Sequence, residues 1–135
     1  MIDIDTLLKE IQTLNLLYVE DNEEARESAL MLFNDLFDNI IVAIDGKDGL
    51  EKFQSNKIDL IITDLSMPEM DGLEMSKTIK QIDNNIPIII LSAITDISIM
   101  EKANNIGINC FINKPLDDID ILFKEFENII IKKNG

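Results

Sequence analysis

Five short apolar runs alternate along this chain with segments whose apolar residues recur at helical spacing. This alternation is typical of βα units arranged around a parallel sheet. Most of the runs are apolar at successive positions, as expected of strands that helices cover on both faces. We therefore predict an α/β protein with five parallel strands. The predicted strands are residues 14–19, 40–44, 58–63, 87–91 and 109–112, and the predicted helices are residues 23–37, 47–54, 73–82, 97–105 and 117–130.

A further helix is predicted before the first strand, because Ile4, Leu7, Leu8 and Ile11 recur at helical spacing. We accordingly divide the chain into an N-terminal helical extension, residues 1–13, and a main domain, residues 14–131. The apolar stripe of the extension needs a partner. It could pack on its own domain, as satellite helices usually do, or it could form the contact of a homodimer.

The composition limits the functions that this chain can have. Its 135 residues suffice for one domain, and 26 acidic against 12 basic residues give a net charge of −14. Phosphate backbones and anionic lipid surfaces would repel such a chain, so we expect no direct contact with nucleic acid and none with membranes. Asp3 and Asp5 stand where a secretory leader would be basic, and Cys110 has no partner for an internal disulfide. We expect a cytoplasmic protein.

The sequence contains no histidine. This absence excludes Ser-His-Asp and Cys-His catalysis and imidazole-ligated metals on this chain. Site chemistry must therefore come from carboxylates, hydroxyls and lysines.

Such side chains follow four of the predicted strands. Glu20 and Asp21 follow the first, Asp64 the third, Ser92 the fourth and Lys114 the fifth. Because the strands of a parallel sheet all end at one edge, where open α/β sheets bind ligands, these residues should converge. Two carboxylates about 4 Å apart repel by roughly 4 kcal/mol at an effective dielectric near 20, so the cluster needs cations beyond Lys114. All-oxygen ligands favour Mg²⁺.

We expect Asp21 and Asp64 to bind Mg²⁺ directly, with the backbone carbonyl of Ser66 as a third ligand and Glu20 acting through bound water. With the ion present, the charges of three carboxylates, one lysine and Mg²⁺ sum to zero, so the site could accept a phosphoryl group. Asp64 would then be the nucleophile that forms an acyl phosphate. Mg²⁺ and Lys114 would stabilise the charge on the transferred oxygens, and Ser92 would donate a hydrogen bond to one of them.

Four motifs in order closely resemble the receiver domain of two-component response regulators, over residues 14–130. They are Glu20-Asp21, Asp64 with the Met67-Pro68-Glu69-Met70-Asp71-Gly72 loop, Leu91-Ser92-Ala93, and Phe111-Ile112-Asn113-Lys114-Pro115. The resemblance implies a doubly wound, flavodoxin-like sheet of order 2-1-3-4-5. It also implies that Asp64 is the phosphoacceptor, that Glu20 and Asp21 are the metal-binding pair, and that Lys114 contacts the phosphoryl group. Ser92 would be the switch hydroxyl and Phe111 the switch aromatic.

The function that this resemblance implies is a signalling switch in a phosphorelay. Asp64 would take a phosphoryl group from a sensor histidine kinase or a phosphotransfer protein in a Mg²⁺-dependent reaction. Beyond this self-phosphotransfer and a slow autodephosphorylation, no enzymatic activity is expected. Transfer would change the surface formed by the predicted helix 97–105, strand 109–112 and helix 117–130, and a downstream effector would bind there. Ile97, Met100 and Ala103 are expected on or near this surface.

Two positions depart from the commoner pattern of that family. Phe111 stands where tyrosine is common, so an output step that uses a phenolic hydroxyl at this position is excluded. Glu20 stands where aspartate is commoner, a variation that the family also uses.

Other interpretations of the same residues remain open. Asp64 could be a helix cap or a loop carboxylate, and Glu20, Asp21 or Asn22 could cap the helix that begins near Glu23. A haloacid-dehalogenase-like phosphatase also uses a strand-end aspartate with Mg²⁺, but it needs a second aspartate where this chain has Ser66. No Gly-x-x-x-x-Gly-Lys run supports a P-loop hydrolase. A receiver-like interaction module that is never phosphorylated is the third alternative.

Ile94, two residues after Ser92, is expected to flank the phosphoryl group and to restrict water near Asp64. We therefore predict that Ile94→Glu speeds the loss of the phosphoryl group from phosphorylated protein. The rate of dephosphorylation, followed on a phosphate-sensitive gel, checks this prediction. An unchanged rate would contradict it.

Overall fold

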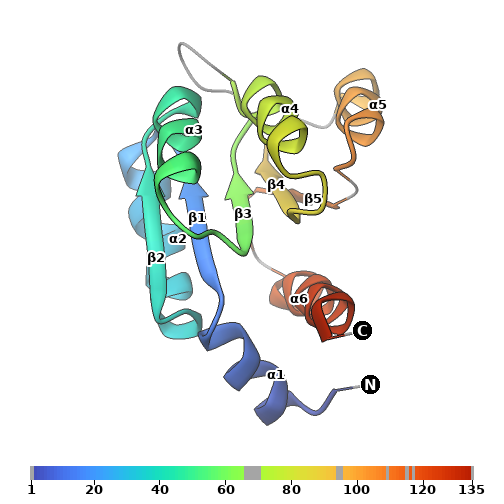
Figure 1. Ribbon diagram of the computed structural model, residues 1–135. Coiled ribbons are helices and arrows are strands. Elements are labelled where there is room, and N and C mark those ends of the chain that lie inside the picture. The colour runs from blue at the N-terminus through green and yellow to red at the C-terminus, as the bar shows by residue number, and fades with distance from the viewer. Residues whose placement is uncertain are drawn as a thin grey trace.

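A computed structural model of the chain describes residues 2–65, 71–93, 96–108, 110–114, 116 and 118–134. Five parallel strands form one sheet of order β2-β1-β3-β4-β5 (Figure 1), which confirms the predicted order. The strands are β1 (Asn15–Val19), β2 (Asn39–Ala43), β3 (Leu60–Thr63), β4 (Ile88–Ser92) and β5 (Cys110–Asn113). The helices are α1 (Ile4–Gln12), α2 (Glu23–Leu36), α3 (Gly46–Ser55), α4 (Gly72–Ile82), α5 (Ile97–Asn105) and α6 (Ile119–Asn134).

The register of the sheet brings the carboxyl ends of its central strands level. Val19 in β1 pairs with Ala43 in β2 and with Thr63 in β3. The ladder continues one step further, because the Glu20 N–H donates to the Ala43 carbonyl at 3.1 Å and the Asp64 N–H donates to the Val19 carbonyl, also at 3.1 Å. The residues that leave β1 and β3 therefore emerge side by side.

Helices cover the sheet on both faces and bury one apolar cluster on each side. Buried residues of α1, α2 and α6 pack on one face, and buried residues of α4 and α5, with half-buried side chains of α3, pack on the other. Burial on both faces explains why the central strands β1, β3 and β4 are almost wholly apolar, since nearly all of their positions are buried. Polar residues are left at the strand ends.

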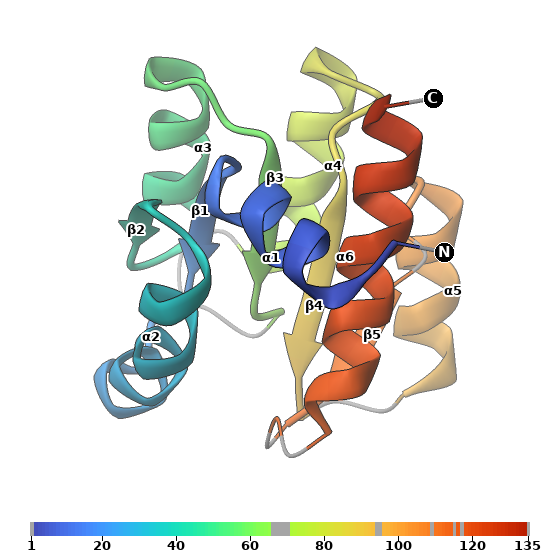
Figure 2. The same ribbon diagram turned by 90° about the horizontal axis from the view of Figure 1, so that it is seen from below.

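The N-terminal helix α1 packs on its own domain. Asp3 caps it by accepting a hydrogen bond from the Thr6 N–H, and Leu7 and Ile11 are buried in the core. The helix lies between α2 and α6 in Figure 2 and contacts both. This packing confirms the local interpretation of its apolar stripe. Both termini lie beside α6, at the end of the molecule away from the carboxyl ends of β1 and β3 (Figure 1).

A chain of aromatic rings connects the sheet to the helices on this face. Tyr18 of β1 meets Phe33 of α2 edge to face, with ring centroids 5.0 Å apart. Phe37 contacts both Phe33 and Phe126 of α6 in the same edge-to-face geometry. Such pairs add about 0.5 to 1.5 kcal/mol each beyond the area that they bury, and they fix the orientation of the rings.

The predicted elements are all present, and their boundaries differ by a few residues. The third strand begins at Leu60, not at residue 58, because the Asn15 N–H at the start of β1 donates to the Asp59 carboxylate at 2.8 Å instead of to a backbone carbonyl of the predicted strand. The last helix continues to Asn134, beyond the predicted residue 130. Lys132 and Lys133 favour this extension, because basic side chains in the last turn interact favourably with the helix dipole. Within the described residues, no helix is long and apolar enough to cross a membrane.

Gly72 begins α4 directly against the end of β3. A Cβ atom at this position would lie 1.9 Å from the Asp64 carbonyl oxygen, and the Gly72 N–H donates to the Leu65 carbonyl at 2.8 Å. We predict that Gly72→Ala lowers the free energy of unfolding by about 3 kcal/mol, because the backbone of one segment must shift. Urea denaturation measures this change.

Gly49→Ala is the matched control, because its nearest obstacle is the flexible Sδ end of Met75 at 2.6 Å and not a backbone atom. It should cost clearly less than Gly72→Ala. Equal stabilities for Gly72→Ala and the unsubstituted protein would show that the close approach of α4 to Asp64 is not required.

Candidate functional site

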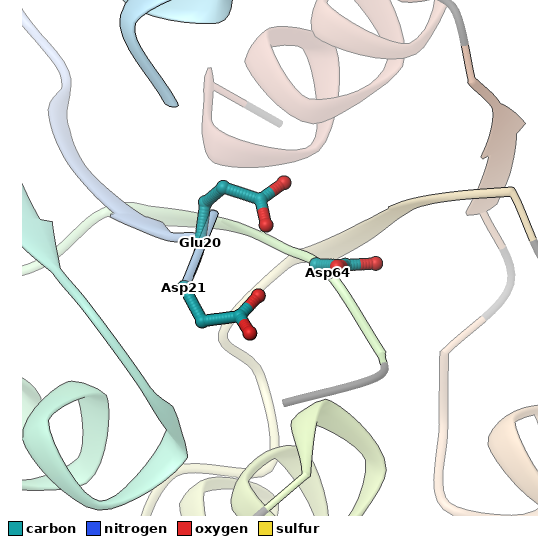
Figure 3. A group of neighbouring side chains, drawn as sticks. All are labelled: Glu20, Asp21 and Asp64. Atoms are coloured by element: carbon teal, nitrogen blue, oxygen red, sulfur yellow. The ribbon is translucent and has the colours of Figure 1, made fainter. Parts of the chain in front are cut away.

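Three carboxylates from two strand ends come together at the carboxyl edge of the sheet. Glu20 and Asp21 follow β1, Asp64 follows β3, and one carboxylate oxygen from each lies within 4.8 Å of the others (Figure 3). Glu20 is only 1% exposed and the Asp64 side chain 13% exposed, whereas Asp21 is open to solvent. The cluster is therefore buried on one side and accessible on the other.

Backbone hydrogen bonds hold Glu20 in its buried position. Its Oε2 accepts a hydrogen bond from the Asn22 N–H at 3.3 Å, and its backbone carbonyl accepts one from Nη1 of Arg26 at 2.9 Å. The cap of α2 is Asn22, whose Oδ1 accepts from the Ala25 N–H at 2.8 Å. The capping interpretation is therefore correct for Asn22, and the carboxylates of Glu20 and Asp21 are left for the cluster.

Asp64 presents its two carboxylate oxygens differently. Oδ1 accepts a hydrogen bond from the Leu65 N–H at 2.8 Å, and Oδ2 lies 3.6 Å from Nζ of Lys114. Asp64 does not cap α4, because the cap is Asp71, whose Oδ1 accepts from the Glu74 N–H. Oδ2 is thus the oxygen that faces the cationic side of the site.

Lys114 reaches the cluster from the end of β5. Its backbone N–H donates to the Ser92 carbonyl at 3.0 Å, which fixes the residue at the sheet edge. Its ammonium group hydrogen-bonds Oε1 of Glu20 and approaches Asp64. Within the described part of the chain, it is the only basic side chain within salt-bridge distance of the three carboxylates.

The charge of the site is incompletely balanced. Burial raises the pKa of Glu20, the hydrogen bond from Lys114 opposes that shift, and the charge of Asp64 adds to it. One lysine against three carboxylates leaves a demand for positive charge that a divalent ion can meet. Each Mg–O distance is about 2.1 Å, so adjacent ligand oxygens lie about 3.0 Å apart and opposite ones about 4.2 Å. The carboxylate oxygens of this cluster lie within 4.8 Å of one another and therefore fit such an ion after small side-chain movements.

The structure places the other predicted residues as follows. Ser92 ends β4 and is buried, and Phe111 of β5 is half-buried against the cluster that α4 and α5 cover. Ser66 and Ile94 lie outside the described residues. Cys110 is half-buried, and burial raises the pKa of its thiol to about 12, so it stays protonated. The prediction for Ala103 was wrong, since this residue is fully buried, whereas Ile97 and Met100 of α5 are exposed.

Sequence analysis missed two residues beside the cluster. Arg26 is one, because a lone basic side chain among glutamates does not reveal that it will bond to a backbone carbonyl. Tyr18 is the other. Its side chain is 1% exposed, and burial together with the charges of Glu20 and Asp64 raises the pKa of its hydroxyl. The sequence did indicate this residue, because Tyr18 is a phenol in a largely aliphatic predicted strand, two residues before Glu20.

Comparison with known proteins agrees with this geometry. The sequence pattern of the response regulator receiver domain matches residues 16–125. Response regulator RR06 of Streptococcus pneumoniae is 32% identical over 117 residues, which are 87% of this chain and 53% of that protein. A receiver domain protein from Clostridium thermocellum is similar in structure, with a TM-score of 0.80 and 26% identity over 90% of this chain and 97% of that one. A chain of the CheX–CheY–BeF3–Mg²⁺ complex from Borrelia burgdorferi has a TM-score of 0.74 and 27% identity over 90% of each chain.

The chain therefore belongs to the response regulator receiver domain family, the receiver domains of two-component signalling systems. It spans 8% of the hybrid signal transduction histidine kinase D of Dictyostelium discoideum and 57% of the CheY protein of Treponema pallidum, so the first curated relatives are much longer than the part that it matches.

The ion pair between Lys114 and Glu20 generates a stability prediction. Lys114→Met leaves the Glu20 carboxylate buried without its cation, and we expect the free energy of unfolding to fall by about 3 kcal/mol in metal-free buffer. Adding Glu20→Gln should recover part of this loss, because the uncompensated charge is then gone. Urea denaturation in the presence of EDTA measures both changes.

Lys47→Met, which removes an exposed lysine of α3, serves as the control and should change stability little. Equal effects of Lys114→Met and Lys47→Met would mean that the buried carboxylate does not depend on Lys114.

Proposed function

We propose that the chain is a phosphoacceptor switch in a phosphorelay and that Asp64 receives the phosphoryl group. The observation that carries this proposal is the convergence of Glu20, Asp21 and Asp64 around one ammonium group, at the sheet edge where ligands of open α/β sheets bind. Membership of the receiver domain family supports it. Because the chain has no histidine, a phosphohistidine donor must lie outside it, on a sensor histidine kinase or a phosphotransfer protein.

In the proposed transfer, Oδ2 of Asp64 attacks the phosphorus atom of the partner's phosphohistidine. The P–N bond breaks, its electron pair stays on the imidazole nitrogen, and a P–O bond to Asp64 forms an acyl phosphate. Oδ2 suits this role because the Leu65 N–H holds Oδ1, while Lys114 lies 3.6 Å from Oδ2 and can follow the transferred oxygens. Lys114 would stabilise their charge, and the hydroxyl of Ser92 would donate to one of them.

The residues that would hold Mg²⁺ are Asp21 and Asp64 as direct ligands, the Ser66 carbonyl as a third, and Glu20 through bound water. A bound ion would supply positive charge to the phosphoryl oxygens as the P–O bond forms. The similarity to a chain of a complex that contains CheY, BeF3 and Mg²⁺ supports this assignment. The proposal includes no other enzymatic activity apart from slow loss of the phosphoryl group.

The output of the switch would be a changed surface on α5, β5 and α6. Ser92 ends β4, and Phe111 lies on the adjacent strand β5, half-buried beneath the cluster that includes α5. A hydroxyl drawn toward the phosphoryl group would leave space for the ring to follow. Ile97 is 71% exposed and Met100 40% exposed on α5, so they offer an apolar contact to an effector or to a second copy of the chain.

The decisive test uses beryllofluoride, which forms a phosphoryl-like adduct with a carboxylate, or acetyl phosphate. We expect either reagent with Mg²⁺ to raise the midpoint of thermal unfolding by several degrees, since a ligand at about 100 times its Kd adds about 2.7 kcal/mol of stability. Asp64→Asn should abolish the shift, because its amide cannot form the adduct. Differential scanning calorimetry measures the midpoint.

Asp35→Asn, which neutralises an exposed aspartate of α2 away from the cluster, is the matched control and should keep the full shift. If the unsubstituted protein shows no shift with Mg²⁺ and either reagent, the phosphoacceptor proposal is wrong. The chain would then be a receiver-like interaction module that is not phosphorylated.

A further inference from the structure

One buried polar group near the site has no role in the proposed function. Tyr18 lies in β1 with 1% of its surface exposed, and its hydroxyl finds no hydrogen-bond partner among the residues that the structure describes. Buried polar groups without a partner are uncommon, and each one requires a physical explanation. In a protein with two conformations, a hydroxyl that donates no hydrogen bond in one conformation can donate one in the other.

Tyr18 lies on the same side of the sheet as Glu20, two positions before it in the sequence. Residues two apart on a strand face the same side of the sheet, so Tyr18 and Glu20 both face the layer of α2 and α6. Phe33 fixes the ring by its edge-to-face contact at 5.0 Å. Burial, and after it the charges of Glu20 and Asp64, raises the pKa of Tyr18, so the hydroxyl keeps its proton and remains a donor.

Glu20 has few hydrogen-bond donors to lose. Lys114 bonds its Oε1, and within the described part of the chain the only other hydrogen bond to this carboxylate is the long one from the Asn22 N–H to Oε2, at 3.3 Å. In the proposed function Lys114 turns toward the phosphoryl oxygens on Asp64, which is already 3.6 Å from its ammonium group. Oε1 would then lose its ammonium donor in a position that is 1% exposed, and the water that would link Glu20 to Mg²⁺ would donate to Oε2. A buried carboxylate oxygen without a donor is strongly unfavourable.

We propose that the Tyr18 hydroxyl donates a hydrogen bond to Glu20 when Lys114 turns toward a phosphoryl group on Asp64. Tyr18 is then a positioning residue that stabilises the phosphorylated state through Glu20, without contact to the phosphoryl group. This inference rests on the proposed function. It also explains why the Tyr18 hydroxyl is buried without a partner among the described residues.

The chain carries its own spectroscopic probe for this step. Tyr18 is its single tyrosine and there is no tryptophan, so the ultraviolet emission of the protein comes from this ring. A hydrogen bond from a phenol to a carboxylate quenches tyrosine emission and shifts its absorption to longer wavelength. Titration of the unsubstituted protein with beryllofluoride at constant Mg²⁺ should therefore quench the emission in step with the rise in thermal midpoint, and Asp64→Asn should show neither change.

Tyr18→Phe tests the energetic consequence, because it removes only the hydroxyl and keeps the ring against Phe33. Without ligand its thermal midpoint should equal or exceed that of the unsubstituted protein, since an unpaired buried hydroxyl is lost. Its apparent affinity for beryllofluoride should fall about tenfold, the effect of one lost hydrogen bond to a charged group. Ser76→Ala is the matched control, because Ser76 of α4 is also a buried hydroxyl without a partner among the described residues, in the opposite layer. It should keep the affinity unchanged.

The results separate this inference from the function on which it rests. No thermal response of the unsubstituted protein would reject the phosphoacceptor function itself. A normal thermal response with unchanged tyrosine emission and absorption would reject the role of Tyr18, and would point to a water molecule as the donor to Glu20. Equal affinity of Tyr18→Phe and the unsubstituted protein for beryllofluoride would reject it as well.

Discussion

The site depends on the register of β1 and β3, which places the carboxyl ends of the two strands side by side. The pairing of Val19 with Thr63 and the hydrogen bond from the Asp64 N–H to the Val19 carbonyl place Glu20 and Asp64 beside each other, although 44 positions separate them in the sequence. A slip of one residue between these strands would turn one of the two carboxylates to the opposite side of the sheet. The apolar faces of both strands, buried against separate helix layers, prevent such a slip.

This register creates an electrostatic problem that only bound cations can relieve. Three carboxylates meet, and Lys114 compensates part of their charge while it bonds the most buried of them. An incompletely compensated cluster at an accessible edge of a sheet lowers the stability of the folded state, because a buried charge without a partner is strongly unfavourable. It is well suited to binding a divalent ion, whose charge would complete the balance and allow a phosphoryl group to approach. The same imbalance would allow Lys114 to turn from Glu20 toward a phosphoryl group on Asp64. We infer that the Tyr18 hydroxyl then donates a hydrogen bond to Glu20.

Much of this could be predicted from the sequence. The apolar runs predicted the five strands, and the polar residues after them predicted which side chains converge, because all strands of a parallel sheet end at one edge. The stripe of Leu7 and Ile11 predicted α1 but left two partners open, its own domain or a second copy of the chain, and the tertiary structure shows the packing on its own domain. Errors arose where a contact across the fold decided the outcome. The bond from Asn15 to Asp59 shortened β3, and packing of α5 on the sheet buried Ala103, which helical spacing alone had placed near the surface.

The sequence by itself determined the fold class, the strand order that its motifs imply, and the chemical groups of the site, because these follow from hydrophobic periodicity and from the order of residues along the chain. The tertiary structure decided which groups touch. Lys114 bonds Glu20 more closely than Asp64, Asn22 takes the capping role, and Arg26 bonds the Glu20 backbone. The Tyr18 hydroxyl is left without a partner in the described part of the chain. Hydrogen bonds are short and directional, so these choices depend on shifts of about 1 Å in side-chain position, which no spacing in a sequence specifies.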